Sequence, residues 1–159
     1  ARLILELRGD CDRALALYDE SAIVDPFYSQ THLARADAYI LCSSGRPDAE
    51  RDTLYRAAAG ALEQGLEHTP GNIRAWVQLA EIYRQLGEFE QAAVVIENAR
   101  ANNGAATFPT SEIDFIDAQI AAGLGDSDKA RALAEQALKT ATPNTAEQIE
   151  AFLAELGGQ

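Results

Sequence analysis

The chain has little of what catalytic and metal sites require. Its 159 residues include two cysteines and two histidines, which are too few and too scattered for a metal site of known spacing. No constellation of catalytic side chains is visible, so we expect a protein that is not an enzyme and that uses no metal or cofactor. Acids at helical spacing, such as Asp114 and Asp117, are typical of a solvated helix face.

Basic residues are also scarce. The chain has 13 Lys and Arg against 25 Asp and Glu, which gives a formal net charge of −12 at pH 7. Because phosphate binding needs a basic face, this charge disfavours a nucleic acid partner. An acidic surface either keeps the chain soluble or attracts a basic partner.

Long apolar runs and methionine are absent as well. No run approaches the roughly 18 to 20 apolar residues that cross a membrane, and nothing at the start resembles a signal peptide. We therefore expect no direct membrane insertion of this segment. The missing methionine, and a start that falls inside an expected helix, suggest a piece of a larger protein. The compartment stays open, cytoplasmic or extracytoplasmic.

What the chain does contain is a repeat. The string GDCDRA at 9–14 returns as GEFEQA at 87–92 and as GDSDKA at 125–130. In each copy a small residue follows the glycine by five positions and another follows it by twelve. These offsets differ by two helical turns, so both small side chains lie on one face of a helix, where a neighbouring helix can approach closely. The strings therefore indicate repeated helix pairs joined at a glycine turn.

A further copy, without its glycine, lies between the first two strings. These strings begin 78 positions apart, which is two units of about 34 residues plus ten. Pro70 closes the additional copy as Pro26 closes the first, and Ala58 precedes Pro70 by the same offset as Ala14 precedes Pro26. We expect the insertion of about ten residues to lengthen a helix over 48–68 by two turns or more.

The segment AWVQLAEIYRQLG, just ahead of the second string, spaces Trp76, Leu79, Ala80 and Tyr83 by three, one and three positions. This pattern resembles the tetratricopeptide repeat family, whose unit of 34 residues has a Trp, Leu, small and Tyr helix, a turn and a second helix. The resemblance covers almost the whole chain. It implies an all-α fold, an α-solenoid that winds as a right-handed superhelix of antiparallel helix pairs.

This frame predicts about four repeats within a single domain over 1–159. The first repeat is truncated, the second carries the ten-residue insertion, and a capping helix follows the fourth. The expected boundaries are 1–28, 29–72, 73–110 and 111–144 for the repeats and 145–157 for the capping helix. The expected helices lie near 10–24, 29–42, 48–68, 73–86, 88–102, 111–123 and 126–140, ahead of the capping helix. A terminal helix of this kind covers an apolar face that the last repeat would otherwise expose.

The two cysteines fall at helix ends that antiparallel neighbours bring side by side. Cys11 opens the second helix of the first repeat, and Cys42 ends the first helix of the second repeat. A disulfide between them is conceivable if their Cα atoms lie within about 7 Å, and it would argue for an oxidising compartment. Free cysteines also serve as small buried hydrophobic residues, so the sequence leaves both states open.

The resemblance also implies a binding surface. In this family the first helices of successive repeats line a concave groove that receives an extended peptide or a partner helix. Leu33, Val77 and Phe115 recur at equivalent places, which predicts an apolar track with acids beside it, although packing between the helices is the alternative. An apolar or basic segment is the expected ligand. The groove residues implied by helical face are Leu33, Asp37, Leu41, Arg74, Val77, Gln78, Glu81, Arg84, Phe115 and Gln119.

The leading functional hypothesis is a non-catalytic module, or scaffold, that binds a peptide or helix of another protein in this groove. One alternative is a soluble accessory or regulatory domain of a larger enzyme or membrane protein, for example a bacterial polysaccharide ligase or polymerase. Another is self-assembly, such as a homodimer formed through the apolar side chains at the start of the chain. These side chains are Leu3, Ile4, Leu5 and Leu7.

Overall fold

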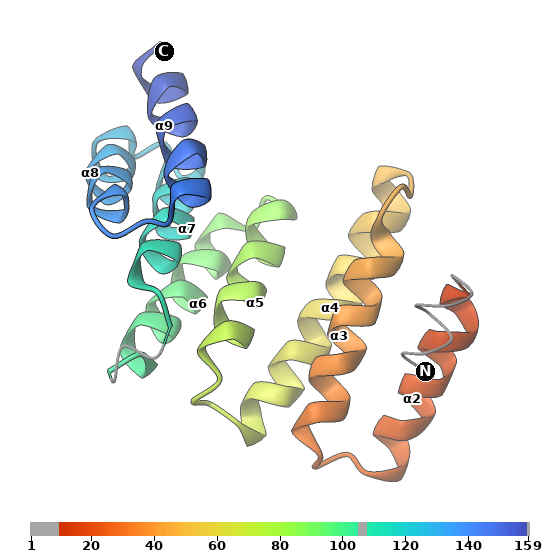
Figure 1. The fold of residues 1–159 in the computed structure, drawn as a ribbon. Coiled ribbons are helices and arrows are strands. Elements are labelled where there is room, and N and C mark those ends of the chain that lie inside the picture. Colours follow the sequence, from red (N-terminus) through yellow and green to blue (C-terminus); the bar gives the residue numbers. More distant parts are fainter. Residues whose placement is uncertain (1–9, 105–107, 159) are drawn as a thin grey trace. The chain divides into compact units, whose positions relative to one another are not determined.

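The computed structural model describes residues 10–104 and 108–158, and within these residues every regular element is a helix (Figure 1). The all-α class predicted from the repeats is confirmed. The apolar residues proposed for self-assembly, Leu3 to Leu7, lie outside the described residues. In chain order the helices are α2 (Cys11–Val24), α3 (Ser29–Ser43), α4 (Asp48–His68), α5 (Ile73–Gln85), α6 (Phe89–Asn102), α7 (Thr110–Gly123), α8 (Ser127–Leu138) and α9 (Pro143–Gly157).

The chain divides into two compact units, Ala1–Ala75 and Trp76–Gln159, with the boundary inside α5. The sequence-based boundaries of the repeats, and the single domain over 1–159, stay predictions. The long helix expected over 48–68 is observed as α4, which has 21 residues. The ten-residue insertion therefore extends this helix.

In the first unit, α3 and α4 form the closest helix pair, and α2 packs against α3. Small residues make this contact possible. A Cβ atom added at Gly65 of α4 would lie 2.9 Å from the Leu33 Cδ2 atom of α3, so a larger residue at this position would require the Leu33 side chain to shift. The side chain of Arg35 on α3 crosses the pair and donates a hydrogen bond of 2.6 Å to Gln64 Oε1 on α4.

Polar contacts and a covalent bond attach α2 to this pair. The Tyr39 hydroxyl of α3 donates a hydrogen bond of 3.2 Å to Asp19 of α2, and the Arg35 guanidinium lies 3.6 Å from the same carboxylate. Burial of the Tyr39 hydroxyl and the nearby Asp19 charge raise its pKa. Cys11 and Cys42 form a disulfide, with their Cα atoms 5.7 Å apart. Of the two states that the sequence left open, the structure therefore has the bonded one.

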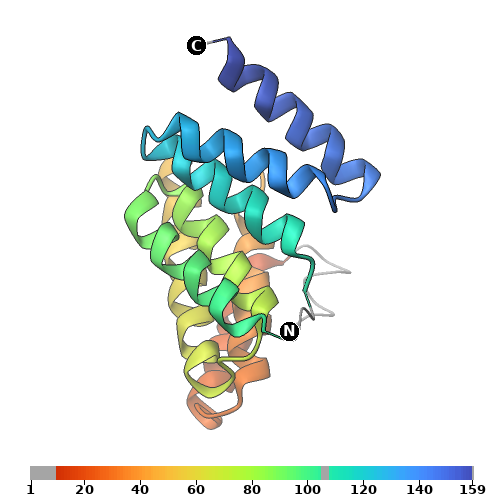
Figure 2. The same ribbon diagram turned by 90° about the vertical axis from the view of Figure 1, so that its left-hand side faces the viewer.

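The second unit has its apolar core where α7, α8 and α9 meet. Figure 2 shows α7 and α8 running side by side, and α9 contacts α8. Ile149 of α9 is fully buried against this core, and Phe152 and Leu153 pack beside it. The capping role expected for the last helix is therefore filled by α9. The core itself consists of Phe115, Ala118, Ala134, Ala137 and Ile149.

A buried ionic cluster joins α6, α7 and α8. Asp114 and Asp117 of α7 are 3% and 2% exposed. The Arg100 guanidinium of α6 donates to Asp114 and, over 2.7 Å, to Asp117. Gln136 and Lys129 of α8 reach the same two carboxylates at 2.9 Å and 3.4 Å. The expectation of a solvated acidic face was wrong at these two positions, because a cation from the preceding helix covers them.

The repeated glycine strings are the turns between helices. Gly87 and Gly125 have φ values of 73° and 83°, a left-handed conformation in which glycine lacks the strain of a Cβ atom. Each turn closes a Schellman motif, and in the second one Asp126 N donates to Ala121 O over 2.9 Å. The residue after the glycine is then the N-cap of the next helix. Asp10 accepts from Arg13 N at 3.1 Å and Asp126 from Lys129 N at 3.0 Å, as N-caps do.

Candidate functional site

A pocket of about 370 Å³ in the second unit brings together several side chains that the sequence assigned to the groove. It lies between α5, α7 and α9, and we call it the α5–α7–α9 pocket. Glu81, Arg84, Phe115 and Gln119 are the predicted residues that line it. The complete lining is Glu81, Arg84, Glu112, Phe115, Ile116, Gln119, Thr145 and Gln148. A hollow of this size accommodates one or two side chains of a bound peptide.

The polar wall of this pocket is built on α5. Arg84 and Glu81 are one helical turn apart, and their side chains form a two-pronged ion pair with N···O distances of 2.6 and 2.7 Å. Hydrogen bonding to Glu81 raises the pKa of Arg84, although burial acts in the opposite direction. Gln85 donates a further hydrogen bond of 2.7 Å to Glu81. The pair is therefore fixed in place before a ligand arrives.

The remaining charge in the pocket is acidic. The Glu81 carboxylate is neutralised by Arg84, but Glu112 is exposed and has no cation within ion-pairing distance among the residues that the structure describes. Gln119 and Gln148 offer amide donors and acceptors of the kind that extended peptide backbones use. Ile116 and Phe115 supply apolar surface. The pocket therefore combines an unbalanced carboxylate, two amides and apolar surface.

The apolar track predicted along the groove stays a prediction, and the exposed fractions of its residues bear on it. Val77 and Phe115 are each 8% exposed, so both side chains are mostly packed, although Phe115 also lines the α5–α7–α9 pocket. The Phe115 ring meets the Phe152 ring of α9 edge to face, with centroids 5.7 Å apart. Leu33 is partly buried beside Gly65. Packing between helices, the alternative interpretation, describes Val77 and Phe115 better.

The other predicted groove residues differ in their accessibility. In the first unit, Leu41 is 56% exposed, and Asp37 and Arg74 are also exposed. In the second unit, Gln78 is partly buried. The binding roles of these four residues stay predictions.

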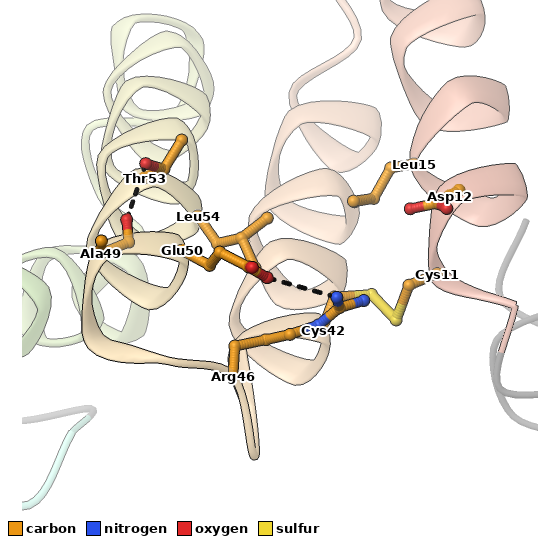
Figure 3. Close-up of a pocket in the computed structure, with 9 residues that line it drawn as sticks. All are labelled: Cys11, Asp12, Leu15, Cys42, Arg46, Ala49, Glu50, Thr53 and Leu54. Atoms are coloured by element: carbon orange, nitrogen blue, oxygen red, sulfur yellow. Dashed lines mark hydrogen bonds and ion pairs between the residues drawn. A yellow bond between two sulfur atoms is a disulfide. The ribbon is translucent and has the colours of Figure 1, made fainter.

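A second pocket, of about 350 Å³, lies beside the disulfide in the first unit (Figure 3). Leu15 of α2 and Leu54 of α4 point toward each other across it, and Cys42 of α3 lies between these two helices. Arg46 pairs with Glu50 at 3.3 Å, so two of the polar side chains satisfy each other. The full lining is Cys11, Asp12, Leu15, Cys42, Arg46, Ala49, Glu50, Thr53 and Leu54. Sequence reasoning missed this pocket, and only the cysteine spacing pointed toward it.

Neither pocket has the side chains of a metal site. Among residues 10–104 and 108–158, no group of three or more His, Cys, Asp or Glu side chains is placed to hold a metal ion. A search of the same described residues for a helix with the length and apolar character of a membrane span found none.

Comparison with known proteins agrees with the repeat pattern. A family model described as tetratricopeptide repeat matches residues 52–106. A search of curated proteins gave no match. This chain is similar to the crystal structure of TTC0263, a thermophilic TPR protein in Thermus thermophilus, with 21% identity and a TM-score of 0.71, covering 99% of this chain and 78% of that one.

A second solved structure, that of MamA, is similar over 96% of this chain and 90% of its own length, with 16% identity and a TM-score of 0.71. Identities this low establish the shared fold and nothing about ligands. The fold is that of the all-α repeat solenoids that the sequence predicted. The repeat strings, the glycine turns and the family model matched over residues 52–106 agree, and together they support a tetratricopeptide repeat assignment.

Proposed function

We propose that this chain is a non-catalytic interaction module that binds a peptide or helix of another protein in the α5–α7–α9 pocket. The fold supports the general part of this proposal, because tetratricopeptide repeat proteins typically mediate protein–protein interaction. The pocket supports the specific part. Four side chains assigned to the groove from sequence line one hollow, and one pair of them is fixed by its own ion pair.

The ligand that suits this pocket carries an apolar side chain next to a basic one. The apolar side chain packs against Ile116 and Phe115, where the release of water stabilises the complex. A lysine or arginine pairs with Glu112, whose charge no described cation balances. The backbone of an extended ligand exchanges hydrogen bonds with Gln119 and Gln148.

The test is a peptide selection from a random display library against the full chain, followed by fluorescence anisotropy with the best peptide. Gln119→Arg fills the pocket and adds a like charge to a basic ligand, so the Kd should rise at least about tenfold. Gln91→Arg makes the same substitution at an exposed position of α6 that does not line the pocket, and should leave the Kd unchanged. Equal affinity of the two variants, or a selection without binders, would contradict the proposal.

The alternatives from the sequence also remain proposals. Sedimentation velocity at several protein concentrations tests the homodimer, which predicts a sedimentation coefficient that increases with concentration. The gene around this segment tests the accessory-domain hypothesis, which predicts a catalytic domain or membrane spans in the same chain.

A further inference from the structure

The turn between α2 and α3 presents four large apolar side chains to solvent. Ile23, Val24, Phe27 and Tyr28 have exposed fractions of 81%, 79%, 76% and 55%. They lie on either side of Asp25 and Pro26 and are close together because they follow one another in the chain. Single exposed apolar residues are common on protein surfaces, but a contiguous group of this kind marks an interaction site. We call these four residues the α2–α3 patch.

The other repeats show that the scaffold does not need apolar side chains here. When the copies are aligned on their small residues, the four positions carry mainly polar or small residues elsewhere. In the second repeat they are Glu67, His68, Gly71 and Asn72, and in the fourth they are Lys139, Thr140, Pro143 and Asn144. In the second repeat, α4 ends and α5 begins at the equivalent positions, so this turn forms there without large apolar side chains. Their presence in the first repeat requires a reason other than folding.

The patch is held in a defined conformation. His32 of α3, which is 4% exposed, makes a hydrogen bond of 2.7 Å through its Nε2 atom to the carbonyl oxygen of Pro26. The Phe27 ring packs edge to face on the His68 ring at the end of α4, with centroids 5.5 Å apart. The Tyr28 carbonyl accepts from Thr31 N at 2.9 Å. A surface that is fixed before binding loses less conformational entropy when a partner docks.

Acids without partners border the patch. Glu20 and Asp25 lie on α2 and in the turn, and Glu67 precedes the histidine that contacts Phe27. All three are exposed, and none has a cation within ion-pairing distance in the described part of the chain. Asp19, by contrast, is already paired with Arg35. The border of the patch therefore attracts positive charge.

We propose that the α2–α3 patch is a second docking surface, and that its partner is a protein segment in which apolar side chains are interleaved with lysine or arginine. The apolar side chains cover the four exposed residues, and the cations pair with the three acids. A second copy of this chain fits less well, because its net charge of −12 opposes an acidic border. The patch belongs to the first unit and shares no residue with the α5–α7–α9 pocket.

The test uses the full chain and a labelled synthetic peptide of leucine and lysine at helical spacing, with a leucine and glutamate peptide as its charge-reversed counterpart. Binding is measured by fluorescence anisotropy. The triple variant Ile23→Gln, Val24→Thr and Tyr28→Asn keeps Phe27, whose ring packs on His68. It should weaken binding of the lysine peptide at least tenfold. Val94→Thr, at a single apolar position of α6 that is 65% exposed, should change the Kd less than twofold.

A second variant tests the charges separately. The combined change Glu20→Gln, Asp25→Asn and Glu67→Gln should weaken binding at least threefold and reduce its salt dependence. Equal binding of the two peptides, or equal Kd values for wild type and triple variant, would overturn the proposal. So would a wild-type dimer that the triple variant abolishes, since a second copy would then cover the patch. Phosphatidylcholine vesicles that capture the wild type alone would assign the patch to a lipid surface instead.

Discussion

Different interactions hold the helices together in the two units. In the first unit, α2 buries only the small side chains of Ala14 and Ala22, and a disulfide attaches it to α3. In the second unit, two buried aspartates of α7 pair with Arg100 of α6 and with Lys129 and Gln136 of α8, which joins three helices beside an apolar core. An alanine side chain removes little apolar area from water, so a helix that buries alanines gains little from packing. The disulfide therefore supplements the small burial of α2, whereas α8, which also buries only alanines, is held by polar contacts to the aspartates of α7.

The largest expected effect comes from breaking the bond in the first unit. The disulfide closes a loop with a sequence separation of 31. Because it lowers the conformational entropy of the unfolded chain, it should stabilise the folded state by about 3.5 kcal/mol. The variant Cys11→Ser with Cys42→Ser, or reduction of the wild type, should therefore speed amide exchange in α2 more than about a hundredfold. Exchange in α8 serves as the control and should not change. Identical exchange of α2 in both redox states would show that noncovalent contacts hold this helix unaided.

The next effect comes from the ionic cluster in the second unit. Arg100→Met leaves two buried carboxylates without their main cation and should lower the free energy of unfolding by about 3 kcal/mol, measured by urea denaturation. Arg131→Met, at an exposed position of α8, should change it by less than about 0.5 kcal/mol. Adding Asp114→Asn and Asp117→Asn to the Arg100 variant should recover part of the loss. If the losses of unfolding free energy from the Arg100 and aspartate substitutions simply added, Arg100 and the two aspartates would not be coupled.

The smallest expected effect concerns the helix N-caps, because each unit has an aspartate N-cap. Asp10 and Asp126 cap α2 and α8 with hydrogen bonds of 3.1 Å and 3.0 Å. Asp126→Ala should cost about 1 kcal/mol in both redox states. Asp10→Ala should cost the same only after reduction, because the adjacent disulfide keeps the start of α2 in place. Hydrogen exchange of the amides in the first turns of α2 and α8 measures both costs. Asp12→Ala is the control, because it removes an acid that is not an N-cap. If Asp10→Ala cost the same in the oxidised and the reduced protein, the proposed difference between the two N-caps would be wrong.

Most of the fold follows from the sequence because its signals are local. Periodic small residues and glycine turns depend on neighbours within one or two helical turns, so the expected helix over 29–42 was found at Ser29–Ser43. The long helix over 48–68 was found at Asp48–His68. These boundaries need no knowledge of distant residues.

The candidate site was harder to predict because it depends on distant residues. The sequence pattern of a helical face that lines a groove is the same as that of a face that packs against another helix. Only the structure shows that Phe152 of α9 packs against Phe115. The acids of α7 looked solvated for a similar reason, since their cation, Arg100, lies 14 and 17 residues earlier in the chain. Glu81 and Arg84, by contrast, are one turn apart on a single helix, and both line the pocket.

The disulfide also determines how this chain responds to tension. It joins the first residue of α2 to Cys42, one residue before the end of α3, so a pulling force that reaches Cys11 passes directly to Cys42. The 31 residue steps between them store about 100 Å of extended chain that stretching cannot release while the bond is intact. The turn between α2 and α3 lies inside this closed loop. Its apolar side chains stay in place under a load that would straighten the reduced chain.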